Sequence, residues 1–353
     1  MLKFILILPL FCSALAPANQ LEAERIQRGF TLSSEKWMLE MKLAKTEPAR
    51  AEVLTRRPNG AARAADLWQS ISPELPEAWV IPYAAFYLGI TQNVRNEGGQ
   101  MLFAKERAQL LKAIGESHCK NPQITPFSLA LIDSGEPQAL GILEKIAKEN
   151  PDNAAQGIAA LGAALVLKNL GDAPEVMAKR LNFLRQAIIK SADQKIANSS
   201  VADIASDELY VIRFLTKGRQ APSFSTMDIA SRTVSLAELK GRTVVLLFWD
   251  SQTEQAAQLI RLTNQIFTKY KDQPVTILGV TQEPAERIRK LQGDGLVLWQ
   301  NISDPTGKLS KEYRINRQPF LYVIDPEGKI QFTGLPGSFV ELTIDAMLNP
   351  VKK

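Results

Sequence analysis

Residues 243–256 read TVVLLFWDSQTEQA, and this stretch decides the fold of the C-terminal part of the chain. Thr243 to Phe248 is a continuous run of apolar and β-branched residues, which is typical of a central strand buried on both faces. From Thr253 to Lys271 the apolar side chains recur at helical spacing. A buried strand that passes directly into an amphipathic helix predicts an α/β unit.

The residues after this unit continue to alternate between strand and helix patterns. Val275 to Val280 predicts a second buried strand. The remaining expected elements are a short helix from Pro284, a strand at 296–299, a helix at 306–313, a hairpin of strands at 320–324 and 329–332, and a closing helix at 338–348. This order predicts a three-layer α/β sandwich.

The residues before about Gly218 indicate a different architecture, in which helix follows helix. The helices are expected at 101–117, 138–149, 154–169, 174–192 and 202–216. In the first of these, Leu102, Leu110, Leu111 and Ile114 are spaced to share one face. Residues 144–172 resemble the hairpin of a tetratricopeptide-type array, but no second copy stands at the expected period. We therefore predict an N-terminal all-helical domain at 19–217, with TPR-like helical hairpins as an open alternative, and a second domain at 218–353.

The N-terminus has the features of an export signal. Lys3 supplies a positive charge, Phe4 to Leu10 an apolar run, and Ser13 to Ala16 small residues suited to cleavage. The apolar run is too short to span a membrane comfortably. We predict a signal peptide at 1–18 and a periplasmic or other extracytoplasmic location, with an uncleaved N-terminal anchor, and so membrane proximity, as the alternative.

Composition excludes several classes of function. The 353 residues include 42 basic and 37 acidic side chains, a net charge of +5 without a block of like charges, so a nucleic-acid site has little support. The chain has one histidine and two cysteines, Cys12 inside the predicted signal and Cys119. An exported chain would keep one cysteine, too few for an internal disulfide or a two-cysteine metal site. With a single histidine we expect no metal, and without a glycine-rich phosphate or dinucleotide motif we expect no other cofactor.

Several motifs stand in one order between Gly218 and Leu348. They are Gly218-x-x-Ala221-Pro222-x-Phe224, the segment VSLAELKGR at 234–242, VVLLFW at 244–249, Asp304-Pro305-x-Gly307, Tyr313-x-Ile315, and Gln318-Pro319 followed by FLYVID. This series resembles the thioredoxin-like redoxins of the TlpA and ResA type and the related AhpC/TSA peroxiredoxins. The resemblance implies a thioredoxin-like fold for 218–353, thiol–disulfide exchange as the activity of the family, and a cis-proline at Pro319.

This chain lacks both cysteines of the active-site motif of that family. Thr253 and Ala256 stand where the resemblance places the two cysteines of the catalytic motif. A threonine hydroxyl stays protonated at neutral pH and cannot form a mixed disulfide, and alanine cannot resolve one. We expect no catalytic residue here, and expect Ser251 or Thr253 simply to cap the following helix.

A degenerate site can still bind. In active relatives the residue before the cis-proline pairs with the backbone of an extended peptide, so the resemblance implies this role for Gln318, with Trp249 and Phe320 lining an apolar pocket. The candidate binding residues are Trp249, Asp250, Ser251, Gln252, Gln318, Pro319 and Phe320.

Three hypotheses follow. The first is a redox-inactive redoxin that binds an unknown protein or peptide. The second is a thiol–disulfide oxidoreductase or antioxidant-type enzyme that uses Cys119 or the thiol of a partner, which requires an accessible Cys119. The third is a purely structural domain. In the alternative without a function for its thiol, Cys119 is simply a turn cysteine beside a helix-terminal histidine, His118.

Overall fold

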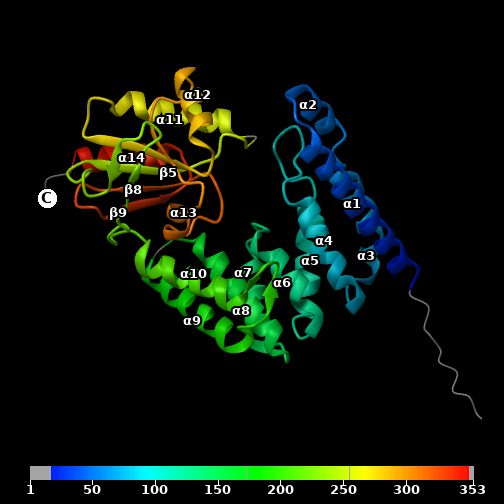
Figure 1. Ribbon diagram of the computed structural model, residues 1–353. Helices are drawn as coiled ribbons and strands as arrows, with labels where there is room; N and C mark the ends of the chain where they lie inside the picture. The colour runs from blue at the N-terminus through cyan, green and yellow to red at the C-terminus, as the bar shows by residue number, and fades with distance from the viewer. Residues whose placement is uncertain (1–16, 172, 254, 350–353) are drawn as a thin grey trace, which may run out of the picture. The chain divides into compact units, whose positions relative to one another are not determined.

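The computed structural model describes residues 17–171, 173–253 and 255–349, so the predicted signal peptide lies almost entirely outside the described residues. The chain divides into a helical unit that ends at Ala205 and a second unit that begins at Ser206 (Figure 1). None of the helices in the described ranges is both long and apolar enough to cross a membrane.

Among its described residues, the first unit is built mainly of helices, as predicted, and also contains one very short hairpin. Its α-helices are α1 (Ala18–Leu43), α2 (Glu47–Thr55), α3 (Gly60–Ile71), α4 (Ile81–Thr91), α5 (Ala104–Ser117), α6 (Thr125–Ile132), α7 (Ala139–Glu149), α8 (Asn153–Lys168), α9 (Pro174–Ser191) and the first part of α10 (Val201–Phe214). The hairpin joins β1 (Lys195–Ile196) to β2 (Ser199–Ser200). Because α5 begins at Ala104, Leu102 precedes the helix and is 49% exposed, so its predicted place on the apolar face is wrong.

Small residues and capping side chains explain how these helices form and pack. Asn59 and Asp152 accept hydrogen bonds from backbone N–H groups at the starts of α3 and α8, where those donors have no partner within the helix. The alanine- and glycine-rich α8 packs between α7 and α9. A Cβ atom added at Gly157 would collide with Ser191 of α9, so close approach of the two helices requires glycine there.

The second unit contains a mixed five-stranded sheet in the order β7-β6-β5-β8-β9. Its strands are β5 (Thr243–Phe248), β6 (Val275–Thr281), β7 (Gln300–Ser303), β8 (Phe320–Ile324) and β9 (Ile330–Gly334). β5, β6 and β7 are parallel, whereas β8 and β9 run antiparallel to their neighbours. A small hairpin of β3 (Ser225–Met227) and β4 (Thr233–Ser235) precedes the sheet.

Helices cover both faces of this sheet. They are α11 (Ala256–Tyr270), α12 (Ala285–Gly293) and α14 (Ser338–Leu348) on one face, and α13 (Lys308–Glu312) with Leu215, just after α10, on the other. All six residues of β5 are buried, because alternate side chains enter the two cores. The predicted thioredoxin-like three-layer sandwich is confirmed.

Two boundaries differ from the expectation. The third strand lies at Gln300–Ser303, and residues 296–299, where it was expected, form no strand; Leu296 and Leu298 are exposed there. The second unit begins before Gly218, because Tyr210 and Val211 of α10 pack with Leu215 against the core of the sheet.

Candidate functional site

Trp249, the first residue after β5, belongs to the core. It is fully buried, its Nε1–H donates a 2.9 Å hydrogen bond to Oδ1 of Asn301, and its ring meets Trp299 edge to face with centroids 5.5 Å apart. The prediction that Trp249 and Phe320 line one apolar pocket is therefore wrong. Phe320 lies opposite Phe248 in the antiparallel pair, so its side chain enters the other face of the sheet, where it packs against Tyr322.

The loop between β5 and α11 is held by a buried carboxylate. Both the backbone N–H and the hydroxyl of Ser251 donate to Glu283, at 2.6 Å to Oε1 and 2.7 Å to Oε2. Glu283 is 6% exposed and follows the end of β6. Arg287 of α12 completes the group, with Nε 2.7 Å from Oε2 of Glu283 and 2.9 Å from Oγ of Ser251. We call Ser251, Glu283 and Arg287 the loop anchor.

Sequence reasoning missed Glu283 and Arg287. Their spacing of four residues allows an ion pair between Glu283, which lies just before α12, and Arg287 within that helix. The contact of Glu283 with Ser251, 32 residues earlier, depends on the parallel pairing of β5 and β6, which brings the ends of both strands to the same edge.

The start of α11 also differs from the prediction. The helix begins at Ala256, and no side chain caps it, so capping by Ser251 or Thr253 is wrong. Ser251 is held by Glu283, and the Thr253 hydroxyl donates instead to the carbonyl of Asp250 at 3.3 Å. Thr253 is exposed, whereas Ala256 is 6% exposed. The two positions at which the resemblance places thiols therefore have opposite accessibility.

The other predicted binding residues gather at one end of the sheet. The pairing of Phe248 with Phe320 continues toward Asp250 and Gln318, so the 250–253 loop and the residues before β8 leave the sheet at the same edge. Asp250 is half-buried and accepts at 2.7 Å from the N–H of Gln252, which is exposed. The Gln318–Pro319 peptide bond is cis.

Gln318 is open to a partner. Gln318, Pro319 and Phe320 are all half-buried. Within residues 17–171, 173–253 and 255–349, neither the backbone nor the side chain of Gln318 has a hydrogen-bond partner. A backbone N–H and carbonyl that lie outside any strand and have no partner can pair with an extended chain.

Cys119 is placed where it cannot react readily. It is 2% exposed, its Sγ lies 3.1 Å from the carbonyl oxygen of Gly115, and burial raises the pKa of the thiol. His118 ends α5 as expected and is buried, with Nε2 2.8 Å from the carbonyl oxygen of Leu75. The described part of the chain contains no group of three or more potential metal ligands.

Comparison with known proteins places the C-terminal unit among the redoxins. Residues 217–333 match the model of the AhpC/TSA family. A thiol-disulfide oxidoreductase ResA of Bacillus cereus is 25% identical over 114 residues, which are 32% of this chain and 66% of that protein. The chloroplastic peroxiredoxin Q of Oryza sativa subsp. japonica is 23% identical over 158 residues, which are 42% of this chain and 73% of that protein.

A solved thiol-disulfide oxidoreductase from Bacteroides fragilis aligns with 37% of this chain and all of its own length, with 24% identity and a TM-score of 0.34. The match to ResA of Bacillus cereus, described above, spans just under two thirds of the length of that protein. The C-terminal unit is a thioredoxin-like redoxin domain related to the AhpC/TSA family, and the helical residues before 217 lie outside the family match.

Proposed function

We propose that the C-terminal unit is a redoxin domain that performs no thiol–disulfide exchange and binds an extended peptide at the edge formed by the 250–253 loop and Gln318. The loss of exchange is supported by one observation above all: no cysteine follows Cys119 in the chain, and Cys119 is buried. Exchange needs an accessible thiolate, and the C-terminal unit has no cysteine to supply one.

The proposed peptide site rests on Gln318. Its backbone groups have no partner among the described residues, and the half-buried Phe320 beside it offers apolar surface. The loop anchor holds the opposite side of this edge, so the surface is formed before a ligand arrives. Main-chain hydrogen bonds would supply affinity, and contacts with alternate side chains of the peptide would supply specificity.

Location and domain limits are also proposals. We propose that the chain is exported, because Lys3, the apolar run and the small residues that follow have the pattern of a signal peptide. We propose a helical domain at 19–217 and a redoxin domain at 218–353, although the second compact unit begins at Ser206 and so also includes the end of α10.

Loss of exchange is tested by reduction of insulin with dithiothreitol as the electron source. Wild type should give the rate of the uncatalysed control, and a Thr253→Cys/Ala256→Cys variant should restore catalysis if the scaffold is otherwise intact. Catalysis by wild type that persists in Cys119→Ser would contradict the proposal. Catalysis lost in Cys119→Ser would instead favour the enzyme hypothesis that uses this thiol.

Peptide binding is tested with reduced, carboxamidomethylated insulin B chain, an unfolded probe that cannot exchange disulfides. Fluorescence anisotropy of the labelled probe should report binding to wild type that weakens about tenfold in Phe320→Ala, a loss of roughly 1.4 kcal/mol. Asn316→Ala, an exposed amide two residues before Gln318, is the matched control. Equal affinities of the Phe320 and Asn316 variants would remove this edge from the proposal.

A further inference from the structure

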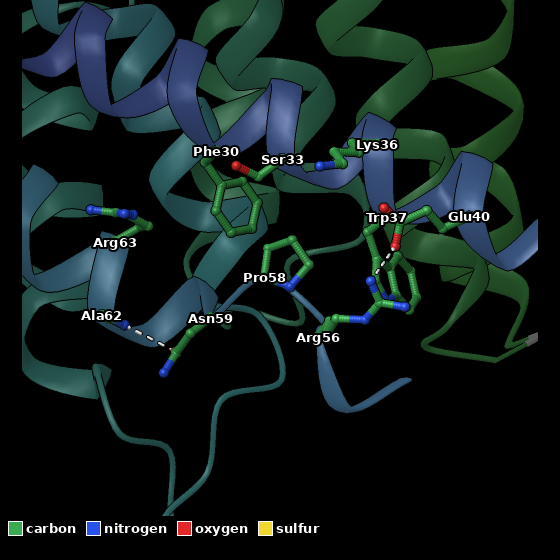
Figure 2. A pocket seen from close by; sticks show the side chains of 10 residues that line it. All are labelled: Phe30, Ser33, Lys36, Trp37, Glu40, Arg56, Pro58, Asn59, Ala62 and Arg63. Carbon is green, nitrogen blue, oxygen red and sulfur yellow. Dashed lines mark hydrogen bonds and ion pairs between the residues drawn. The ribbon is translucent and has the colours of Figure 1, made fainter. Parts of the chain in front are cut away.

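The helical unit contains a pocket of its own, of about 500 Å³. One wall is the face of α1 from Phe30 to Glu40, and the other is the segment from Arg56 into the first turn of α3. Figure 2 shows the rings of Phe30, Pro58 and Trp37 following one another across it, with Arg63 at one end and the Arg56–Glu40 pair at the other. We call this the α1–α3 groove.

The apolar walls of the groove are fixed in place. The ring of Phe30 meets Phe86 edge to face, with centroids 5.8 Å apart. Nε1–H of Trp37 donates a 2.9 Å hydrogen bond to the carbonyl oxygen of Val53. A Cβ atom added at Gly60 would lie 3.1 Å from the carbonyl oxygen of Ile90, so glycine permits the close approach that shapes the wall beside Phe30. A ligand would therefore meet a preformed aromatic surface.

The charges that line the groove favour an anion. Lys36, Arg56 and Arg63 contribute three positive charges against one carboxylate, Glu40, which lies 3.3 Å from Arg56. Lys36 has no ion-pair partner among the described residues, and its charge is free to attract a ligand.

Two neighbouring carboxylates, Glu52 and Asp66, balance the net charge of the lining residues. The Arg57 guanidinium, however, lies over the ring of Trp37, 5.5 Å from its centroid, and keeps the region positive. Arg63 also pairs with Asp66 at 3.4 Å, and Arg56 lies 3.7 Å from Glu52, both in exposed pairs that contribute little and exchange readily. The N-terminus of the twelve-residue α3 opens at the same place, and the helix dipole adds positive potential there.

The length of the groove indicates the form of the ligand. From Phe30 to Glu40 the helix rises about 15 Å, at about 1.5 Å per residue. That distance matches about four or five residues of an extended chain. The first 16 residues of this chain contain no carboxylate, so they lack the charge that the groove favours. We propose that the α1–α3 groove binds an acidic, extended segment of a partner protein, with apolar side chains on the rings and carboxylates near Lys36 and Arg63.

The test compares two fluorescein-labelled octapeptides, Glu-Leu-Asp-Trp-Glu-Leu-Asp-Gly and its counterpart with Gln and Asn at the acidic positions. Anisotropy titration with the full chain should show the acidic peptide binding about tenfold more tightly, and the difference should shrink as NaCl rises from 50 to 500 mM, because salt screens exposed charges. Lys36→Gln should weaken binding of the acidic peptide about fivefold or more. Lys42→Gln, which removes the same charge from α1 outside the groove, should leave binding unchanged.

Three results would overturn the proposal. They are no saturable binding of the acidic peptide up to 1 mM, equal affinity for the two peptides, and equal affinity of the Lys36 and Lys42 variants. Thermal unfolding of both variants at the wild-type temperature would show that a loss of binding reflects the groove. None of these results depends on Gln318, so a failure of the acidic peptide to bind would leave the proposed peptide site of the redoxin domain unaffected.

Discussion

The hydroxyl of Ser251 donates a 2.7 Å hydrogen bond to the buried carboxylate of Glu283. This contact fixes the loop that precedes α11, and Ser251 lies two residues before Thr253. The loop is thus ordered by a carboxylate that accepts hydrogen bonds from backbone and side chain, without help from a disulfide or a helix cap. An edge that is ordered without thiols is compatible with the proposed peptide binding, whereas thiol–disulfide exchange would need a thiolate at this place.

Removal of the carboxylate should loosen this loop. Glu283→Ala leaves the Ser251 N–H and the Arg287 guanidinium without their shared acceptor. We therefore expect the free energy of unfolding to fall by about 2–3 kcal/mol. Denaturant-dependent hydrogen exchange of peptides that cover β5 and the 250–255 loop would measure it. Glu286→Ala, at a carboxylate in the first turn of α12 whose side chain is 79% exposed, should change stability by less than about 0.5 kcal/mol. Equal effects of the two variants would show that the anchor is dispensable.

The sequence was sufficient wherever a local pattern and burial agree. β5, β8 and α14 have the predicted bounds, because a continuous apolar run, a strand beside a turn, and an apolar helical period each specify one structure. The strand expected at 296–299 failed because an apolar tetrapeptide fits an irregular segment equally well, and here Leu298 faces solvent.

The candidate site was predicted less well, because it depends on which side of the sheet each side chain faces. Strand alternation already assigns Trp249 to the same face as Leu247, so its burial could have been deduced from period two alone. The role of Glu283 could not, since its partner Ser251 is brought near only by the pairing of β5 with β6.

A glycine in the central sheet makes room for the aromatic pair beneath it. A Cβ atom at Gly279 would lie 2.0 Å from Oδ1 of Asn301 and under 3 Å from the indole nitrogens of Trp249 and Trp299. Gly279→Ala should therefore displace these side chains and break the Trp249–Asn301 hydrogen bond, at a cost of about 3 kcal/mol. Chemical denaturation followed by tryptophan fluorescence would measure the loss.

The matched control is Gly293→Ala at the end of α12, where a Cβ atom would meet nothing within 4 Å. Because alanine favours helix more than glycine does, this variant should be neutral or more stable by up to about 1 kcal/mol. A Gly279 variant as stable as the Gly293 variant would contradict the close packing described here.

Cys119 should resist alkylation in the native chain. Burial both blocks the reagent and raises the thiol pKa, so little thiolate forms at neutral pH. Labelling with iodoacetamide, followed by mass spectrometry, should be at least about a hundredfold slower than in 6 M guanidinium chloride, since it requires local opening. Raising the pH from 7 to 9 should accelerate labelling of the native chain at least as much as that of the denatured chain, because the native chain reacts through the exposed thiolate of its open state. Rapid native labelling at pH 7 would revive the enzyme hypothesis that uses this residue.

The two positions that replace the thiols should differ when cysteine is introduced singly. In a Cys119→Ser background, Thr253→Cys places a thiol on an exposed loop and should be alkylated at nearly the rate of a free peptide. Ala256→Cys places it at a site 6% exposed, so alkylation should be at least about tenfold slower. Equal rates would mean that the start of α11 opens readily, which would also weaken the case for a preformed binding edge.

Asp228 should make the C-terminal unit sensitive to acid. Burial acts to raise its pKa, but hydrogen bonds from Arg232, Gln300 and the N–H of Ala230 outweigh it, so the pKa of the folded state is lowered. A lowered pKa contributes stability that is complete above the unfolded value of about 3.9 and is lost as pH falls through the folded value. The free energy of unfolding of Asp228→Asn should thus lie below that of wild type by a constant amount from pH 7 to 5, and this difference should shrink below about pH 4. Urea denaturation at each pH would measure it, with the exposed Asp272→Asn as control; a deficit that grows on acidification would contradict the assigned direction of the shift.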